Sequence, residues 1–348
     1  MLSRSVLIIG NYGAGNLGDD AILGGILSDL KAVGFTGRIR VTHGGVKSSR
    51  DIYKGLELVP FVPSGLRSRF RSESNQALQA IRESDLIILG GGGLFTDAES
   101  RRAPYIWATQ AKAAHKLKKP YICHGQSIGP LKTFLGRWWA KRTFKNAKAI
   151  HVRDGASAEL LKEWGLESTV GTDPAFSWLL PLQRQLQLQK KQPRKPVLML
   201  SLRLWPGHPE KTWEPLLKEI KVFAKRKHLK PILIAMDTCN TKEIEALKRT
   251  KMELFEPRSA LEAFEGFEKS TLGVTMRLHA CIFALASRTP FIALAYSQKV
   301  SALFPKSILT GGELRDALKD LPLLTSLSDL ESPLSQNQAF LARQLADL

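Results

Sequence analysis

An apolar stretch near the N-terminus runs directly into a glycine-rich turn and then into a helical pattern. Residues 5–9 predict a buried strand, residues 10–18 read GNYGAGNLG, and residues 22–30 show a helical spacing of apolar side chains. A strand, a glycine turn and a helix in this order can direct backbone N–H groups at an anionic ligand. The feature predicts an α/β fold in which helices connect parallel strands.

A second glycine turn follows another predicted buried strand. Residues 86–89 are apolar, and the four residues after them are all glycine, Gly90 to Gly93. Four consecutive glycines cost chain entropy, and they make sense where the backbone must approach a ligand closely. We expect the two turns to lie side by side at the carboxyl ends of neighbouring parallel strands, where open α/β sheets bind ligands.

Strand and helix patterns alternate along the chain in two groups. The expected strands are 5–9, 39–42, 86–89, 121–124, 149–153, 197–202, 231–235, 271–275 and 290–294, with a weak edge candidate at 59–62. The expected helices are 22–30, 77–82, 106–117, 134–144, 156–164, 213–225, 241–251 and 278–286.

This alternation predicts two Rossmann-like domains that face each other across a cleft holding the active site. We expect an N-terminal domain at residues 1–181 on the acceptor side, a polar and basic linker at 182–196, and a C-terminal domain at 197–330 on the donor side. The remaining residues, 331–348, predict a C-terminal helix that can pack back on the first domain.

The chain is strongly basic, with a formal net charge of +19. Such a field attracts nucleic acids, anionic lipids and anionic substrates without choosing among them. We find no zinc-finger spacing, no aromatic RNA-binding motif and no basic heptad, so a nucleic-acid partner is not expected. Positive charge is dense from residue 112 to 148. Within it, FLGRWWAKR at 134–142 either rests on an anionic membrane or has its apolar stripe in the core and its cations in solvent.

The three cysteines, Cys123, Cys239 and Cys281, are far apart in the sequence, and none has a neighbour at metal-ligand spacing. This predicts a reducing cytoplasm and no metal site. No apolar run reaches the roughly 18 residues that cross a bilayer, and no signal peptide is visible. We expect a cytoplasmic protein, at the inner face of the cytoplasmic membrane if the basic helix binds there.

The first turn matches the dinucleotide-binding pattern GxGxxG at residues 13–18. That pattern also requires an acidic residue at the end of the second strand, and residues 41–44, VTHG, contain none. Asp19 and Asp20 would also repel a pyrophosphate at the start of the helix. NAD(P) binding is therefore disfavoured, and a purely structural alternative is a tight turn in which Asp19 or Asp20 caps the helix.

Cationic side chains follow the strands of the second half. Arg277 and His279 come after strand 271–275 and suit an anionic substrate that needs proton transfer. A histidine at this place can also merely hydrogen-bond a neighbouring loop. Arg203 and Lys299 follow two other strands, and the three cations can converge on one phosphate–carboxylate ligand. The alternative is that they are ordinary surface cations.

Three further polar residues follow the strands of the first half. Asp97 can orient a sugar hydroxyl or cap the helix after it. Gln126 and Arg153 are candidate acceptor contacts, although Arg153 can instead form an internal ion pair with Asp154.

Taken together, these motifs resemble the polysaccharide pyruvyl transferase family, of the CsaB type that modifies cell-wall polymers. The resemblance runs from Gly10 to about Val300, and its order and spacing are specific although each motif alone is weak. One departure is that the family usually has Asp-Pro where this chain has Ser297-Gln298. The motifs are GNLGDDAI at 15–22, GGGL at 91–94, GQSIGP at 125–130, TDPAF at 172–176, SLR at 201–203, RLHA at 277–280 and YSQKV at 296–300.

The resemblance implies transfer of a pyruvyl group from phosphoenolpyruvate to a sugar of a glycan or lipid-linked glycan, which forms a ketal and releases phosphate. It implies a fold similar to that of GT-B glycosyltransferases, with no metal and no cofactor. We expect His279 to act as the general acid and Asp19 as the base, with Asp97 behind it. The donor clamp is then Arg203, Arg277 and Lys299, and the turns contribute Gly13, Gly15, Asn16, Gly18, Gly91, Gly92 and Gly93.

Two other functions fit parts of the sequence. A nucleotide-sugar-dependent GT-B glycosyltransferase would use Glu256, Glu262 or Glu265 as a ribose partner. A non-catalytic basic scaffold would bind polymer or membrane in a salt-sensitive way and release no phosphate.

Overall fold

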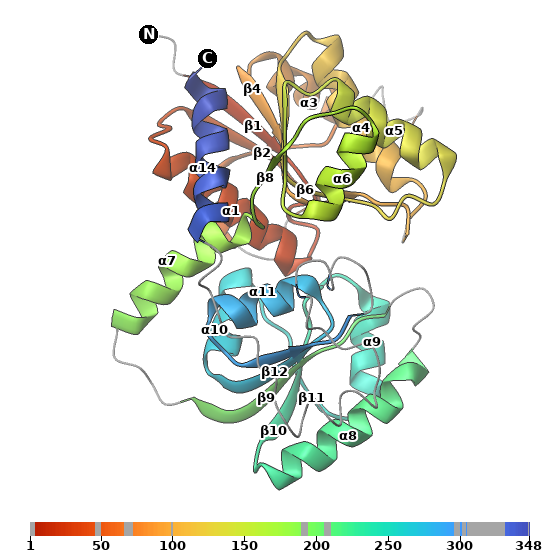
Figure 1. Cartoon of the computed structure of the whole chain (residues 1–348), viewed down its shortest axis with the longest axis vertical. Helices are drawn as coiled ribbons and strands as arrows, with labels where there is room; N and C mark the ends of the chain where they lie inside the picture. Colours follow the sequence, from red (N-terminus) through yellow and green to blue (C-terminus); the bar gives the residue numbers. More distant parts are fainter. Residues whose placement is uncertain are drawn as a thin grey trace. The chain divides into compact units, whose positions relative to one another are not determined.

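The computed structural model describes residues 4–45, 50–65, 72–98, 100–188, 194–204, 210–295, 300, 304, 331–346 and 348. The chain forms two compact units (Figure 1). The first unit comprises Met1–Ala14, Ile22–Trp178 and Leu330–Leu348. The second unit comprises Gly15–Ala21 and Leu179–Asp329, so a short piece of the first glycine turn belongs to it.

The first unit is built on a parallel eight-stranded sheet. Its strands are β1 (Ser5–Ile9), β2 (Arg38–Thr42), β3 (Glu57–Val59), β4 (Leu86–Leu89), β5 (Gly92–Phe95), β6 (Tyr121–Ile128), β7 (Ala149–Val152) and β8 (Thr169–Val170). Their order is β3-β2-β1-β4-β6-β7-β8, and β5 pairs with β6. The helices are α1 (Leu17–Ala32), α2 (Arg50–Tyr53), α3 (Ser72–Arg82), α4 (Ala103–Lys116), α5 (Phe134–Lys145), α6 (Gly155–Glu163), α14 (Glu331–Ala346) and the start of α7 (Ala175–Leu188).

The strand order reverses between β1 and β4, and both predicted glycine turns follow these two strands. Ile9 is in register with Leu89, and the Gly90 N–H donates to the Ile9 carbonyl at 2.7 Å. The prediction that the turns lie at the ends of neighbouring parallel strands is therefore confirmed. This is the position where open α/β sheets bind ligands.

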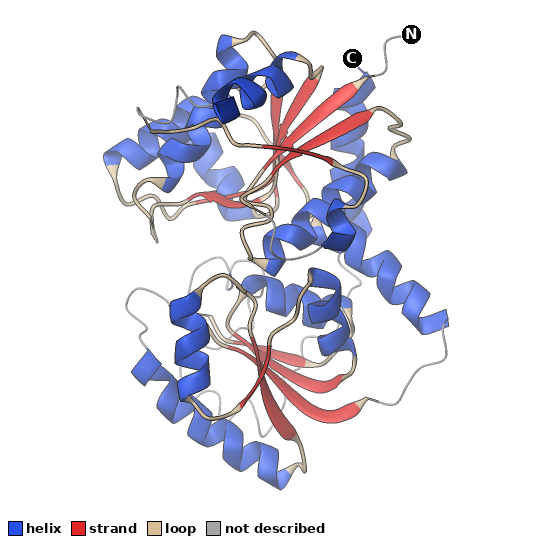
Figure 2. Cartoon of the chain, turned by 180° about the vertical axis from the view of Figure 1, so that it is seen from behind, coloured by secondary structure: helices blue, strands red, loops and turns tan. Residues whose placement is uncertain are grey.

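The second unit contains a parallel five-stranded sheet with the same kind of order, β11-β10-β9-β12-β13. Its elements are β9 (Lys195–Ser201), a short 3₁₀ helix (Glu210–Thr212), α8 (Trp213–Arg226), β10 (Lys230–Ile234), α9 (Thr241–Arg249), β11 (Glu253–Phe255), α10 (Ala260–Glu268), β12 (Ser270–Thr275), α11 (Leu278–Ala286) and β13 (Phe291–Ala293). Helices cover both faces of each sheet (Figure 2), so the strands read as continuous apolar runs.

The second glycine turn and the linker differ from the sequence-based expectation, and the structure adds elements that were not expected, including α2, α10, β8 and β11. Residues 92–95 of the second glycine turn form β5 instead of an open turn, and the second half of β6 provides its pairing partner. Residues 182–188 of the expected linker are the end of α7, because LQRQLQL contains only good helix formers. Residues 195–196 open β9, so the linker was predicted too long at both ends.

Helix α14 completes the first unit from the far end of the sequence, and it packs against β7 and β8. Its Asn337 side chain accepts a hydrogen bond from the Thr172 N–H at 3.0 Å. Its Phe340 ring stacks on His124, with ring centroids 5.6 Å apart, and lies 5.2 Å from His151. The helix therefore covers β6 and β7 with a buried aromatic contact and holds the segment after β8 with a buried polar contact.

Two buried histidines lie beneath α14, His124 within β6 and His151 within β7. The rings of His124 and His151 stack with centroids 4.7 Å apart, and His124 Nε2 lies 3.9 Å from a carboxylate oxygen of buried Asp29. His151 Nδ1 accepts a hydrogen bond from the Gly125 N–H at 3.0 Å. Burial, with a smaller contribution from His124, lowers the pKa of His151 to about 2.

The depressed pKa of His151 predicts a loss of stability in mild acid. The unfolded chain binds a proton on this side chain below pH ~6.5, whereas the folded chain keeps the imidazole neutral down to pH about 2. The stabilisation is complete above pH ~6.5 and decreases by roughly 1.4 kcal/mol per pH unit below it, or about 2 kcal/mol at pH ~5.

Urea unfolding measured at several pH values tests this prediction against a His151→Phe variant. Phenylalanine preserves the ring contact with Phe340 but cannot bind a proton. The unfolding free energy of the wild type minus that of the variant should therefore decrease as the pH falls. A difference that stays constant between pH ~7.5 and ~5 would contradict the role of His151.

Candidate functional site

The reversal of strand order in the second unit lies between β9 and β12, and two of the predicted cations follow these strands. Ser201 is in register with Thr275, and the Met276 N–H donates to the Ser201 carbonyl at 2.7 Å. Arg203 and Arg277 each come two residues after these paired positions. The sheet therefore brings both arginines to one edge, at the point where such sheets bind ligands.

The peptide Gly15–Ala21 is part of the same unit, and backbone hydrogen bonds hold it beyond the end of β10. The Leu17 N–H donates to the Met236 carbonyl at 3.0 Å, and the Thr238 N–H donates to the Gly15 carbonyl at 2.8 Å. Gly15 has a φ of +94°, and a Cβ there would lie 2.4 Å from Cys239 Sγ. Glycine is needed at position 15 for both reasons.

His279 lies directly against Gly18 in this unit. A Cβ at position 18 would be only 2.2 Å from His279 Nδ1 and 2.3 Å from its Cγ. His279 is half-buried in the first turn of α11, and Asp19 follows Gly18 in the chain. The sequence analysis singled out Gly18, Asp19 and His279 separately, and the structure brings Gly18 and His279 into contact.

The start of α1 corrects two expectations. Asn16 caps the helix, because its Oδ1 accepts from the Gly18 N–H at 3.1 Å, so neither Asp19 nor Asp20 is this cap. The Asn16 carbonyl accepts from the N–H groups of both aspartates. With Leu17 also bonded, these four N–H groups already have protein acceptors, and the expectation that they point at an anion is wrong for them.

Arg277 is a buried cation with a buried partner that the sequence analysis did not find. Its side chain is 5% exposed, and its Nη2 pairs with Glu243 of α9. A carboxylate oxygen of Asp237 lies 3.9 Å from the same nitrogen. The second Glu243 oxygen accepts from the Leu204 N–H at 3.1 Å. Glu243 therefore connects the arginine that follows β12 to the segment that follows β9.

The donors of Arg277 are not all used by this pair. Among the residues that the structure describes, its Nε is buried without a hydrogen-bond partner. Arg277 is the N-cap residue of α11, but its side chain makes no capping hydrogen bond there. A buried N–H donor beside a helix N-terminus is suited to an anionic oxygen.

Of the other two expected clamp residues, Arg203 and Lys299, the structure describes only Arg203. Arg203 is half-buried after β9. Lys299 falls outside the described residues, together with Tyr296, Ser297 and Gln298.

The glycines of the first unit pack closely on their own surroundings. A Cβ at Gly90 would lie 2.0 Å from the Tyr12 hydroxyl oxygen, and one at Gly91 would lie 2.9 Å from the Gly125 carbonyl oxygen. Gly92 and Gly13 have positive φ values of 102° and 65°, which only glycine adopts easily. Close packing and backbone conformation therefore already require glycine at these positions, and Gly93 lies half-buried in β5.

Gln126 is buried and ties β6 to the second glycine turn. Its side-chain amide donates to the Leu89 carbonyl at 3.1 Å and also to the Gly90 carbonyl. Among the described residues, its Oε1 is buried without a hydrogen-bond partner.

Asp97 holds the loop before α5. Its two oxygens accept from the Lys132 N–H at 2.6 Å, and from the Thr133 N–H and hydroxyl at 2.7 and 2.6 Å. Burial acts to raise the pKa of Asp97, but these hydrogen bonds outweigh it and lower the pKa below its ordinary value. The carboxylate thus stabilises the approach to α5, not the start of α4, the next helix in the chain.

Arg153 forms an internal ion pair, but not with the neighbour that the sequence suggested. Its Nη1 pairs with buried Asp173, from the TDPAF motif. Asp154 instead caps α6, where it accepts from the Ser157 N–H at 2.8 Å. The expectation of an Arg153–Asp154 pair is therefore wrong, because Asp154 starts a helix and the chain brings Asp173 to the strand end.

The three glutamates considered as ribose partners have structural contacts. Glu256 pairs with Lys248 at 3.1 Å, and Glu265 pairs with Lys269 at 2.9 Å. Glu262 accepts from the Arg258 N–H at 2.7 Å, at the start of α10.

The described residues contain no group of three or more His, Cys, Asp or Glu side chains that could hold a metal ion. No helix in this part of the chain combines the length and the apolar character needed to span a bilayer.

A family model described as polysaccharide pyruvyl transferase matches residues 16–298. No curated protein matches the chain significantly.

Solved structures with similar folds are nucleotide-sugar proteins of the GT-B type. A UDP-GlcNAc 2-epimerase from Methanocaldococcus jannaschii superposes with a TM-score of 0.65 at 13% identity, covering 99% of this chain and 100% of its own. The Anabaena protein HepE, in complex with UDP and glucose, has a TM-score of 0.59 at 14% identity, covering 99% and 100%. The Neisseria meningitidis epimerase bound to UDP-GlcNAc has a TM-score of 0.62 at 10% identity, with the same coverage.

Proposed function

This chain belongs to the polysaccharide pyruvyl transferase family, and from that membership we propose that it moves a pyruvyl group from phosphoenolpyruvate to a sugar of a cell-wall or surface polysaccharide. The acceptor is the glycan itself or its lipid-linked precursor. The products are a pyruvate ketal and free phosphate, and the reaction needs no resident cofactor. The observation that carries this proposal beyond the family is the contact of His279 with the turn that precedes Asp19, beside buried Arg277.

The chemistry requires an acid, a base and a cationic clamp. A proton must first reach the methylene carbon of phosphoenolpyruvate, which makes the central carbon electrophilic. One sugar hydroxyl then adds to that carbon and loses its proton, phosphate leaves, and a second hydroxyl closes the ketal. The methyl group keeps the first proton, and the hydroxyl protons leave with phosphate and solvent.

We assign the acid to His279 and the base to Asp19. A histidine changes its protonation state near neutral pH, which suits it to donate a proton and recover it. In support of this assignment, the imidazole contacts Gly18, the residue that directly precedes Asp19 in the chain. Both oxygens of Asp97 accept hydrogen bonds from the loop before α5, so Asp97 is a weaker candidate for the base than Asp19.

We assign the donor clamp to Arg277, Arg203 and Lys299. Glu243 holds the Arg277 guanidinium in one orientation, and the buried Nε is left to donate to a phosphate or carboxylate oxygen. The N-terminus of α11 adds backbone donors at the same place.

We propose the strand ends around the glycine turn of the first unit as the acceptor side. Gln126 and Arg153 fix this edge through their contacts with Gly90 and Asp173. We also propose a cytoplasmic location, because all three cysteines are free thiols in the structure. A lipid-linked acceptor would be met at the inner face of the cytoplasmic membrane.

A phosphate-release assay with phosphoenolpyruvate and a panel of glycan acceptors tests the proposal. We expect release that depends on both substrates, together with thermal stabilisation by phosphoenolpyruvate. Parallel samples with UDP-sugars test the glycosyltransferase alternative. Stabilisation by UDP-sugars alone, with no phosphate release from phosphoenolpyruvate on any acceptor, would contradict the proposal.

Gly18→Ala should lower the rate of phosphate release by about 100-fold, because the added methyl group displaces the His279 ring and misaligned groups react slowly. Steady-state kinetics and the thermal unfolding midpoint should be measured together. Gly155→Ala is the matched control, because a Cβ there meets nothing within 4 Å. Equal rates for the two variants would separate Gly18 from the chemistry.

A further inference from the structure

The positive charge of the chain is concentrated in one stretch of the first unit. Residues 101–148 contain twelve Lys or Arg residues and no Asp or Glu. They include helices α4 and α5, which pack against each other (Figure 1). Glu163 of α6 pairs with Arg137 at 3.3 Å, and the net positive charge of the stretch is suited to a polyanion or to an anionic membrane.

The outer face of α5 carries large apolar side chains beside these cations. Phe134 is 81% exposed, Leu135 is 65% exposed and Trp138 is 43% exposed. Exposed Lys141, Arg142 and Lys145 continue the same face along the helix, since they follow at helical spacings of three, four and seven residues.

The fold of the first unit does not require this outer face. The opposite side of α5 is buried through Gly136, Ala140, Thr143 and Phe144. Thr133 caps the helix by accepting from the Gly136 N–H at 3.0 Å, and the Tyr121 hydroxyl donates to the Thr143 carbonyl at 2.5 Å. The buried face of α5 thus fixes the helix to the first unit, and the opposite face leaves its apolar side chains exposed.

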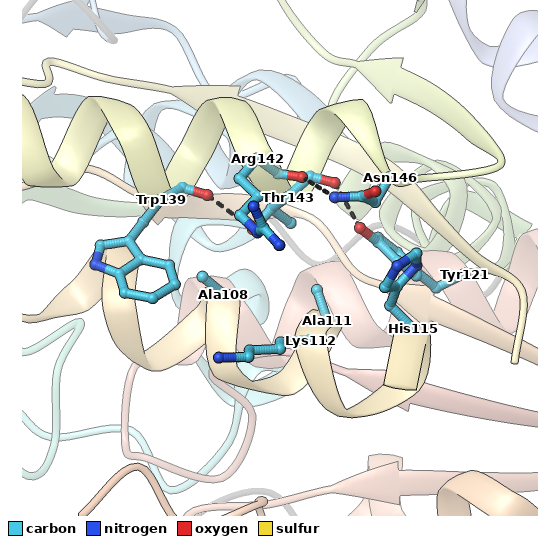
Figure 3. A pocket seen from close by; sticks show the side chains of 9 residues that line it. All are labelled: Ala108, Ala111, Lys112, His115, Tyr121, Trp139, Arg142, Thr143 and Asn146. Carbon is cyan, nitrogen blue, oxygen red and sulfur yellow. Dashed lines mark hydrogen bonds between the residues drawn. The ribbon is translucent and has the colours of Figure 1, made fainter. Parts of the chain in front are cut away.

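A small pocket lies between α4 and α5, next to the exposed face (Figure 3). Lys112 and His115 reach it from α4, and Arg142 and Trp139 reach it from α5. The Arg142 guanidinium also lies 5.6 Å from the Trp138 ring centroid. Two cations and an imidazole beside indole rings form a setting for a phosphate at the boundary between water and lipid.

We propose that the α4–α5 surface docks on a membrane of anionic phospholipids. Phe134, Leu135 and Trp138 enter the interfacial layer, and Arg142 and Lys112 bind headgroup phosphates at the pocket. This inference concerns helices α4 and α5 of the first unit, and it does not depend on the proposed pyruvyl transfer.

A membrane fits the surface better than a nucleic acid or a second copy of the chain. Phosphate backbones would use the cations and leave three large apolar side chains in water. A second copy would place two surfaces with the same net positive charge against each other, and like charges would repel. An interface of lipid headgroups satisfies both the cations and the apolar residues.

Flotation with vesicles tests this directly, without any substrate present. We expect binding to phosphatidylcholine vesicles that contain about 30% phosphatidylglycerol, and little binding to phosphatidylcholine alone. The triple variant K141E/R142E/K145E should weaken binding by at least about 100-fold, since each cation near such a surface contributes about fivefold. The variant F134S/L135S/W138S should weaken binding by at least about 30-fold at the same net charge.

A charge-matched control distinguishes this surface from the overall charge. K218E/K221E/K225E makes the same change on exposed positions of α8 in the second unit, and it should retain most of the vesicle binding. Equal loss in both charge variants, or unchanged binding in the serine variant, would overturn the proposal. So would selective binding of duplex DNA, or a dimer that the serine variant dissociates. Phosphate release on a soluble acceptor is measured separately, so failure of either proposal is visible by itself.

Discussion

Replacing His279 with alanine is expected to lower phosphate release from phosphoenolpyruvate by about 10²–10⁴-fold, the usual contribution of a general acid. Alanine removes the imidazole that we assign to protonation of the methylene carbon. The substitution should leave the fold intact, because His279 is half-buried at the first turn of α11 and the buried face of that helix is apolar. Steady-state kinetics at saturating acceptor, together with the unfolding midpoint, measure both expectations.

A matched control is the variant His228→Asn, which removes an exposed histidine of the same unit. Asparagine tolerates the positive φ of 52° at this position, so the control changes an imidazole without straining the backbone. We expect wild-type kinetics from it. If His279→Ala retains a rate near that of the control, the proton must come from another group, and the assignment of His279 is wrong.

The variant Glu243→Ala is expected to lower the free energy of unfolding by about 3–5 kcal/mol, which is typical when one partner of a buried ion pair is removed. Among the described residues, the substitution leaves the buried Arg277 guanidinium with Asp237 as its remaining carboxylate neighbour, 3.9 Å away. It also removes the acceptor of the Leu204 N–H. Urea unfolding measures the loss, and Glu245→Ala on the exposed side of α9 should change the unfolding free energy by less than about 0.5 kcal/mol.

A double substitution separates stability from function at this pair. Glu243→Leu with Arg277→Met removes both charges and fills the space with apolar atoms, so it should recover most of the lost stability. Stabilisation by phosphoenolpyruvate should not return with it, because the proposed donor to the ligand is gone. A double variant that is stable and also binds phosphoenolpyruvate normally would exclude Arg277 from the clamp.

The periodicity of the sequence was sufficient to predict the architecture. Parallel strands buried on both faces give continuous apolar runs, and the strands at 5–9 and 86–89 have the bounds that the sequence predicted. The helix at 278–286 also has its predicted bounds. The missed elements α2, β5, β8 and β11 are short, but the nine-residue helix α10 was also missed although its apolar residues have helical spacing. The two-residue strand β8 and the glycine-containing strand β5 exist only because neighbouring strands provide their hydrogen bonds.

The sequence could predict only those residues of the candidate site that directly follow a predicted strand. Arg277 and His279 stand out because they follow a buried strand, but nothing near them in the sequence indicates Glu243, which lies 34 positions earlier. Glu243 follows Asn240 by three residues, a pattern that indicates an ordinary helix start. Likewise, no local pattern shows that Gly15 must be small because of Cys239.

The return of α14 to the first unit has a consequence for the order of events during synthesis. Because Asn337 and Phe340 belong to a helix that follows the second unit in the sequence, β7 and β8 leave the ribosome long before the helix that covers them. The whole second unit is translated in the interval. A nascent chain stalled after β13 should therefore expose β6 and β7 to proteases and chaperones, even when the second unit has already folded.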